Sequence, residues 1–351
     1  MKSNKKKSDN MIEAFENMNK EINKEINKEN KIDIEDLDFS YATGEDLINN
    51  DITEVPMLFH PILHQVGMAS IYGSSDVGKS SLARLFCILV VLGYNFGEFI
   101  NQAIFKRAIY VSLEDDLFAI SPLFKKQAKA LGLNASQLKG IEFIFFSDNI
   151  IQELDELLSA NPADLVVVDP YSQVCSKDMY KANEVRDVLS EYQRLAVKHR
   201  CLIIFVHHTK KHSISSSPDK NNALGSQAFE AYLRLLIEVK SNINNPQKKH
   251  VCITKGNYVP TEYKKESFDF EFTEDLIYKS LGTRTPLDRL DIPESKENDL
   301  KEEYEKIIKM KNKGMTLRDI GKKLKISHVA VSKKISNYET KFKSDEEEED
   351  E

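Results

Sequence analysis

The sequence predicts an α/β fold with a mostly parallel β-sheet, followed by a small all-α domain. Between about residues 51 and 260, wholly apolar, β-branched runs alternate with segments of helical periodicity. This alternation is typical of a parallel sheet that helices cover on both faces. A glycine-rich stretch ending in Lys79-Ser80 joins the first of these runs to the first helical segment. Residues 301–343 are helical in pattern and basic, with 13 Lys and Arg against 5 Asp and Glu, a net charge of +8.

Composition limits the classes of protein to which the chain can belong. Its 351 residues allow one core domain of average size and smaller appendages. It has no run of eighteen apolar residues and no apolar segment behind its basic N-terminus, so we expect neither a membrane partner nor a secretory signal. The four cysteines stand apart in apolar runs, which predicts buried reduced thiols and a cytoplasmic location. The net charge of −7 is unevenly distributed, so local charge decides about nucleic acid.

Shifts in composition divide the chain into segments. Residues 21–28 repeat Glu-Ile-Asn-Lys, which either forms a short assembly helix or belongs to a solvated, partly disordered arm. Residues 283–300 are polar with two prolines, and residues 345–351 are all acidic. We therefore expect a charged arm (1–40), a core domain (41–282), a linker (283–300), a helical domain (301–343) and an acidic tail (344–351).

The stretch from Gly73 to Ser80 reads Gly-x-x-x-x-Gly-Lys-Ser, the P-loop pattern for binding nucleotide phosphates. An apolar run at 66–72 enters it as a strand, and a helical pattern at 82–91 leaves it. The glycines let backbone N–H groups surround an anion, and the positive end of the following helix adds to that field. Lys79 can reach the β- and γ-phosphates, and the Ser80 hydroxyl can ligate Mg²⁺. The alternative is a glycine-serine turn that binds nothing.

ATP and Mg²⁺ are therefore the expected ligands. The residues expected around the phosphates are Gly73, Ser74, Ser75, Asp76, Val77, Gly78, Lys79, Ser80 and Ser81.

The remaining elements of the core follow in chain order. The expected strands are 108–113, 141–146, 165–168, 201–206, 232–240 and 250–255. The expected helices are 122–131, 151–158 and 184–199. Parallel sheets bind ligands at the carboxyl ends of their strands, so polar residues directly after a strand are the candidates for chemistry.

Three such residues stand out. Asp169 follows the apolar run 165–168 in the Walker B pattern, where it would hold Mg²⁺; the alternative is an Asp-Pro turn. Glu114 ends the strand after the P-loop helix and is the candidate base for the attacking water, with Asp115 as an auxiliary. His208 ends a later strand and would sense the γ-phosphate; the alternative is a half-exposed histidine without that role.

Together, these motifs resemble a known family. Ser112-Leu113-Glu114-Asp115-Asp116, the run 165–170 and the run 206–211 are similar, in this order, to the RepA-type hexameric replicative helicases of plasmids and phages, which are RecA-like P-loop ATPases. The resemblance covers about residues 50–260. It implies a RecA-like core, a ring of subunits, normally six, with ATP at the interfaces, and an arginine supplied by the neighbouring subunit.

The resemblance also implies a candidate for that arginine. Arg234 matches a family arginine; the alternative is a strand-edge arginine in a surface ion pair. Lys255 resembles the first member of the Lys-x-Arg pair of related DnaB-type helicases, but Asn257 stands at the second position. Leu224 stands where the family usually has an arginine. The identity of the arginine therefore stays open.

In such rings the loop after the sensor strand faces the central channel. Lys210 and Lys211, together with Lys220, would contact the phosphates of a single DNA strand. The loop carries no aromatic residue for base stacking, and the alternative is a disordered polar loop.

The segment 317–335 resembles a helix-turn-helix. Gly321 stands where two helices must approach, and Ser327 is a good N-cap for the second helix. The residues expected at duplex DNA are His328, Ser332, Lys333 and Lys334. The alternative is a helical bundle that binds protein, and the acidic tail could compete with DNA for this face.

The sequence thus predicts an ATP-hydrolysing DNA helicase or motor for replication of a plasmid, phage or mobile element. The alternative is an ATP-switched DNA-binding regulator or recombination mediator that does not unwind DNA. A third hypothesis is a nucleotide-gated assembly protein whose basic domain binds protein.

Overall fold

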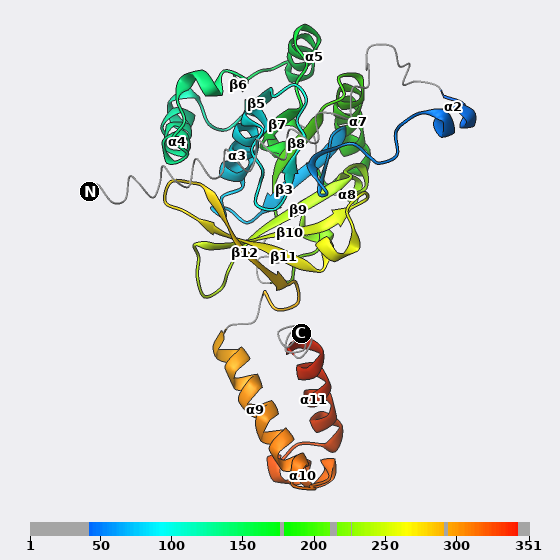
Figure 1. The fold of residues 1–351 in the computed structure, drawn as a ribbon, viewed down its shortest axis with the longest axis vertical. Coiled ribbons are helices and arrows are strands. Elements are labelled where there is room, and N and C mark those ends of the chain that lie inside the picture. The colour runs from blue at the N-terminus through cyan, green and yellow to red at the C-terminus, as the bar shows by residue number, and fades with distance from the viewer. Residues whose placement is uncertain (1–41, 176–178, 211–215, 226, 291–293, 343–351) are drawn as a thin grey trace.

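The computed structural model describes residues 42–175, 179–210, 216–225, 227–290 and 294–342 (Figure 1). The predicted arm and acidic tail, and Lys211, lie outside these residues. The core is a nine-stranded sheet in the order β12-β11-β10-β9-β3-β8-β7-β5-β6.

Six neighbouring strands of this sheet are parallel, which confirms the predicted fold class. They are β3 (Gly67–Gly73), β5 (Ala108–Ser112), β6 (Ile141–Phe145), β7 (Leu165–Asp169), β8 (Leu202–His208) and β9 (Leu235–Ser241). Gly73 lies opposite His208, and Ser112 lies opposite Asp169. The P-loop and the predicted polar residues therefore share one edge of the sheet, the carboxyl edge.

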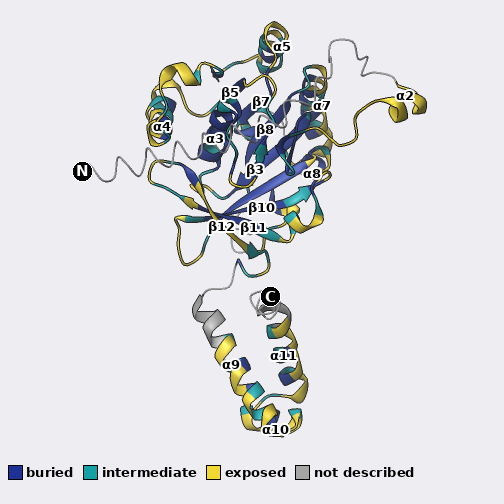
Figure 2. Ribbon diagram, in the orientation of Figure 1, coloured by how far each residue is buried: buried dark blue, intermediate teal, exposed yellow. Residues whose placement is uncertain are grey.

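Helices cover both faces of the parallel strands because alternate strand residues point to opposite faces. Ala69 and Ile71 pack with the apolar side of α3 (Lys79–Leu92). Met68 and Tyr72 pack on the other face, with α5 (Ile150–Ala160) and α7 (Ala182–Lys198). Figure 2 shows the strands buried between helices whose outer sides are exposed. This two-sided burial explains why the strands read as continuous apolar runs.

Two helices differ from the prediction at their ends. Helix α4 (Leu117–Ala130) begins before the expected residue 122, because Asp116 caps it by accepting the Ala119 N–H at 2.9 Å. Tyr232, expected to begin a strand, instead ends the short helix α8 (Gln227–Tyr232), which was not predicted, and the strand β9 begins at Leu235. The four-residue helix α6 (Tyr171–Val174) follows β7.

The antiparallel part of the sheet extends beyond the predicted core domain. It consists of β10 (Lys248–Gly256), β11 (Glu266–Phe272) and β12 (Tyr278–Pro286). The predicted end at residue 282 falls inside β12, whose side chains are mostly exposed, so no apolar run marked it. At the other end, the predicted linker overlaps α9 (Glu294–Asn312).

A small second sheet packs beside the main one. It comprises β1 (Met57–His60), β2 (Leu63–His64) and β4 (Ile100–Asn101). Within the part of the chain that the structure describes, the short helix α2 (Gly44–Asn49) precedes this sheet, and 3₁₀ helices lie at Ala135–Leu138, Lys220–Asn222 and Thr261–Lys264.

Three helices form a separate C-terminal unit: α9, α10 (Leu317–Leu324) and α11 (His328–Phe342). They surround a small core of Tyr304, Ile307, Ile320, Val331 and Ile335. As predicted, Gly321 lies at the close approach: an added Cβ would lie 2.7 Å from the Ile326 carbonyl oxygen. The Ser327 hydroxyl oxygen accepts the Ala330 N–H at 3.1 Å at the start of α11.

All four cysteines lie within the described residues and are buried thiols, as predicted. Among the described helices, none combines the length and the apolar character needed to span a membrane.

Candidate active site

The P-loop turns tightly between β3 and α3 because two of its positions require glycine. A Cβ at Gly73 would lie 2.5 Å from the Val239 carbonyl oxygen. Gly78 has a φ of 96° and begins α3 without a side-chain cap. The first turn of α3 therefore has no side chain that competes with an anion for its N–H groups.

Lys79 lies folded over this loop. Its Nζ donates to the Ser74 carbonyl oxygen at 2.6 Å, and the residue is only 6% exposed. Burial lowers the pKa of Lys79, while the charges of Asp169, Asp76 and Glu114 oppose this effect. A buried ammonium group with one carbonyl partner fits a site that receives phosphate oxygens.

Asp169 and Ser80 meet at the end of β7. The hydroxyl groups of Tyr110 and Ser80 donate hydrogen bonds to the Asp169 carboxylate. Burial raises the pKa of Asp169, and these hydrogen bonds work against the rise. The described residues contain no cluster of three or more His, Cys, Asp or Glu side chains able to hold a metal. Ser80 and Asp169 suit Mg²⁺, which usually takes few protein ligands and completes its shell with water and phosphate.

Arg84, which lies behind this site on α3, was not identified from the sequence. Arg84 is 2% exposed, and its guanidinium group donates to the side chains of Gln127 (3.1 Å) and Ser81 (3.2 Å). Its positive charge lowers the pKa of Asp169. A lone arginine inside the apolar pattern 82–91 was the signal that could have identified it.

Two aromatic residues of the antiparallel part support the P-loop from behind. The Tyr278 hydroxyl donates to the Val77 carbonyl oxygen at 3.1 Å. A Cβ on Gly78 would lie 2.7 Å from the Tyr278 hydroxyl oxygen and 3.1 Å from Phe272. These contacts could not be predicted because the strands that bring them, β11 and β12, were not recognised in the sequence.

The three acidic residues after β5, Glu114, Asp115 and Asp116, act in different ways. Glu114 is exposed at the carboxyl edge. Burial lowers the pKa values of both Lys79 and His208, and the charge of Glu114 opposes that lowering. Asp115 contributes its backbone carbonyl oxygen, which accepts the Ser112 hydroxyl at 2.7 Å, and Asp116 caps α4. Of the three, Glu114 is the carboxylate whose charge acts on the P-loop lysine.

His208 is half-buried at the end of β8, opposite Gly73. Burial and the positive charge of Lys79 lower its pKa, while Glu114 and Asp169 raise it. The net shift favours a neutral imidazole, which carries one N–H donor and one acceptor.

Arg234 lies at the amino-terminal ends of the parallel strands, opposite the carboxyl edge. It directly precedes β9 and is exposed, and its N–H donates to the Met68 carbonyl oxygen at 3.0 Å. Because β9 is parallel to β3, this position is remote from the carboxyl edge of the same chain. Lys255 lies near the same strand ends as Arg234, paired with Glu230 at 3.0 Å. The structure therefore does not bring Arg234 to its own P-loop.

The two ends of the loop after β8 pair with each other. Thr209 pairs with Ala223, and the Thr209 N–H donates to the Gly73 carbonyl oxygen at 3.2 Å. Lys210 is exposed, with its Nζ 2.8 Å from the Asn221 carbonyl oxygen, and Lys220 pairs with Glu230 at 3.4 Å. The base of the loop is thus attached to the first residue of the P-loop.

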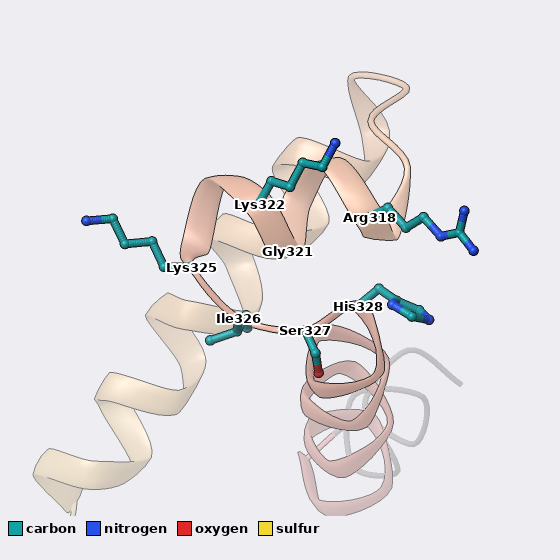
Figure 3. Close-up of a pocket in the computed structure, with 7 residues that line it drawn as sticks. All are labelled: Arg318, Gly321, Lys322, Lys325, Ile326, Ser327 and His328. Atoms are coloured by element: carbon teal, nitrogen blue, oxygen red, sulfur yellow. The ribbon is translucent and has the colours of Figure 1, made fainter.

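In the C-terminal unit, His328, Ser332 and Lys333 are exposed. Lys334 instead pairs with Glu303 of α9 at 2.6 Å, which partly neutralises its charge. A hollow of about 410 Å³ lies between α10 and the start of α11, as Figure 3 shows. Its lining residues are Arg318, Gly321, Lys322, Lys325, Ile326, Ser327 and His328.

Comparison with known proteins identifies a family. A model described as "AAA domain" matches residues 37–213, slightly more than half of the chain. Among solved structures, the RadB recombinase is 17% identical, with 60% of this chain and 88% of that chain covered and a TM-score of 0.43. A KaiC-like protein from the hyperthermophilic archaeon Pyrococcus horikoshii is 14% identical, with 63% and 95% covered and a TM-score of 0.45.

Both TM-scores lie below 0.5. No curated protein matches the chain. The family match spans the P-loop, Glu114, Asp169 and His208. On this evidence the chain belongs to the AAA domain family, with a P-loop nucleotide-binding core.

Proposed function

We propose that this protein is an ATP-driven DNA helicase or motor that serves the replication of a plasmid, phage or other mobile element. One observation carries the proposal: the carboxyl edge of the parallel strands brings together Lys79, Ser80, Asp169 and His208, and the loop after β8 is attached to it. An edge of this kind combines a nucleotide site with a segment that can respond to it.

In the proposed reaction the chain's own residues bind, orient and accept a proton. Lys79 would leave the Ser74 carbonyl oxygen to contact the phosphates of ATP, and Ser80 and Asp169 would hold Mg²⁺. The ion would supply charge neutralisation at the phosphates. Glu114 accepts a proton from the attacking water. Neutral His208 donates a hydrogen bond to the γ-phosphate and loses that partner when the phosphate leaves.

The proposal includes a homo-oligomeric ring of six subunits. Arg234 would act on the nucleotide of the neighbouring subunit, since it lies remote from its own P-loop and is exposed. Lys255 is less available for this role because its Nζ contacts both the carboxylate and the carbonyl oxygen of Glu230. In a head-to-tail ring, one subunit's Arg234 edge would meet the next subunit's carboxyl edge.

Two surfaces would contact DNA. Lys210, with Lys211 outside the described residues, would contact a single strand, and the C-terminal unit would bind duplex DNA as a helix-turn-helix. His328, Ser332 and Lys333 are exposed on one helix as that role requires. In Figure 3, Arg318 and His328 extend to the same side of the hollow. This arrangement supports binding of backbone phosphates there.

The alternative function is an ATP-switched DNA-binding regulator or recombination mediator. Two observations favour it: Asn257 and Leu224 replace the arginines of the resembling helicases, and the loop after β8 lacks aromatic residues. Weak hydrolysis would suffice for a switch but not for a motor.

Unwinding of a forked DNA duplex separates the two functions. The wild-type chain should unwind the fork only with ATP and Mg²⁺, and Lys79→Ala should abolish unwinding. Lys139→Ala, an exposed lysine remote in sequence from the motifs, serves as the matched control and should behave as wild type. Hydrolysis and DNA binding without unwinding would establish the switch instead.

A further inference from the structure

A buried carboxyl group on β9 has no role in the site described above. Glu238 is 1% exposed, and its carboxylate accepts the Asp219 N–H and the Asn222 side-chain amide, both at 3.1 Å from Oε2. Tyr72, the residue before Gly73, lies with its hydroxyl oxygen 3.3 Å from the same Oε2. Glu238 therefore joins the P-loop strand to the segment 216–224, called here the return segment.

The return segment in turn holds the end of β8. The Lys210 N–H donates to the Asn222 carbonyl oxygen at 2.9 Å, and the Leu224 N–H donates to the His208 carbonyl oxygen at 2.9 Å. On its other side, the backbone of β8 pairs with Gly73. His208 is thus fixed between the P-loop strand and the return segment.

His207 adds a side-chain contact to this arrangement. It is fully buried, and its Nε2 lies 2.8 Å from the Leu224 carbonyl oxygen. Because a carbonyl oxygen only accepts, Nε2 carries the proton in this contact. Burial lowers the pKa of His207 to about 4, so the ring is neutral near pH 7.

We propose that Glu238 is a positioning residue: it fixes the return segment against β3 and thereby sets His208 and Lys210 relative to the P-loop. The return segment's attachment follows from the hydrogen bonds alone. The effect on nucleotide turnover rests on the proposed function.

A count of protons indicates which form of Glu238 fits best. The Tyr72 hydroxyl oxygen lies within hydrogen-bond distance of three oxygens, on Thr254 (2.7 Å), Asp219 (3.0 Å) and Glu238 (3.3 Å). The Thr254 hydroxyl also contacts the Leu236 carbonyl oxygen at 3.2 Å. Four oxygen–oxygen contacts share only two hydroxyl protons, from Tyr72 and Thr254. A proton on Glu238 would supply a third.

The surroundings agree with this count. Burial raises the pKa of Glu238 to about 6, although hydrogen bonds from Asn222 and Asp219 lower it. Titratable groups on three strands face it: Tyr72 on β3, Lys240 on β9 and Cys252, which lies opposite Glu238 on β10. Lys240 donates to the Ser216 carbonyl oxygen and so also contacts the return segment.

The sign of the pH effect follows. The folded-state pKa of Glu238 is above its ordinary value of 4.5 because of burial, so its protonated form stabilises the folded chain. That contribution is complete below about pH 4.5 and is lost as the pH rises through about 6. The free energy of unfolding should therefore fall between pH 5 and 7, whereas the hydrogen bonds from Asp219 and Asn222 favour the carboxylate and persist at pH 7.

Amide hydrogen exchange of the full-length chain tests the attachment directly. Glu238→Leu removes both carboxylate oxygens, so the return segment loses the acceptor of the Asp219 N–H. Protection of the Asp219 amide, and of the Lys210 and Leu224 amides that join β8 to the return segment, should fall about tenfold. Glu238→Gln keeps one carbonyl acceptor, so its protection should stay within about threefold of wild type. Its free energy of unfolding should lack the fall between pH 5 and 7, because the amide does not titrate. Glu271→Leu, at an exposed position on β11, is the matched control.

A second pair of variants keeps the test sharp if Glu238→Leu does not fold. Asn222→Asp places a second carboxyl group at the Glu238 carboxylate and should reduce protection at pH 7. Combining it with Glu238→Gln restores an amide–carboxylate pair with the roles reversed and should recover most of the protection. Unchanged protection in both Glu238→Leu and Asn222→Asp would overturn the proposal.

Kinetics then separate positioning from damage to the P-loop. Glu238→Leu should lower kcat about tenfold and leave KM for ATP within twofold, because Lys79 and Ser80 are not touched. A raised KM with an unchanged kcat would contradict a positioning role. If the wild-type chain hydrolyses no ATP, the proposed function fails, while hydrogen exchange still decides whether Glu238 holds the return segment.

Discussion

The core and the C-terminal unit carry their functional residues in opposite ways. In the core, Lys79 and Asp169 are held by half-buried Ser74 and Ser80 and by buried Tyr110. In the C-terminal unit, the candidate residues are exposed side chains on helices that share a core of five buried residues. Chemistry that needs shifted pKa values requires a large buried framework, whereas contact with a charged polymer requires only an exposed basic surface.

The substitution with the largest expected effect impairs ATP hydrolysis by the core and leaves the C-terminal unit unchanged. Glu114→Gln should lower kcat for ATP hydrolysis roughly 10²- to 10⁴-fold, because the amide cannot accept the proton of the attacking water. ATP affinity should change little, since Glu114 is exposed and makes its contribution in the reaction. Single-turnover hydrolysis and a fluorescent nucleotide titration measure the two quantities. Hydrolysis within threefold of wild type would exclude Glu114 as the base.

The second substitution destabilises the C-terminal unit and leaves the core folded. Ile307 is fully buried, and Ile307→Ala should cost about 2–5 kcal/mol, comparable to the whole stability of a unit this small. Thermal unfolding followed by circular dichroism should show early loss of the C-terminal helices, with ATP hydrolysis retained below that transition. Val329→Ala, at a position 62% exposed on the same unit, is the control. A single cooperative transition for both parts would contradict independent folding.

The comparison also explains what could be predicted from the sequence. The parallel strands were recognised because burial on both faces makes each an uninterrupted apolar run, as in Val166–Val168. β12 was missed because most of its side chains are exposed. Consequently Tyr278, which supports Val77 from β12, could not be assigned to the P-loop.

Some site residues escape sequence reasoning for a different reason. Glu114, Asp169 and His208 were identifiable in the sequence because each polar side chain stands at the end of an apolar, strand-like run. Arg84 and Glu238 lie inside helix and strand patterns, where their partners come from segments distant in the chain. The pairing of Lys334 with Glu303 likewise depends on how α11 packs on α9.

A smaller effect sharpens the description of the core. Tyr278→Phe removes the hydroxyl group that donates to the Val77 carbonyl oxygen and leaves the ring in place. Loss of one buried hydrogen bond, about 1 kcal/mol, should weaken nucleotide binding about fivefold. Isothermal titration with ATP and Mg²⁺ measures this, with Tyr263→Phe as control. Equal affinities for both variants would show that Tyr278 does not support the P-loop.

The smallest effect sharpens the description of the unit. Lys333→Ala should weaken duplex DNA binding a few-fold and reduce the slope of log K against log salt by about one. Lys334→Ala should do less, because Lys334 is already paired with Glu303. Fluorescence anisotropy at several salt concentrations compares them, with Lys311→Ala on α9 as control. If Lys334→Ala has the larger effect, the pair with Glu303 does not persist on DNA.

In the proposed function, the carboxyl edge binds nucleotide and couples its hydrolysis to the binding of DNA. Its most direct test is steady-state ATP hydrolysis by the full-length chain, measured over a titration of single-stranded DNA, with Lys79→Ala beside it. We expect hydrolysis that depends on Lys79 and rises with added DNA. Hydrolysis that persists in Lys79→Ala, or that stays constant across the DNA titration, would contradict it.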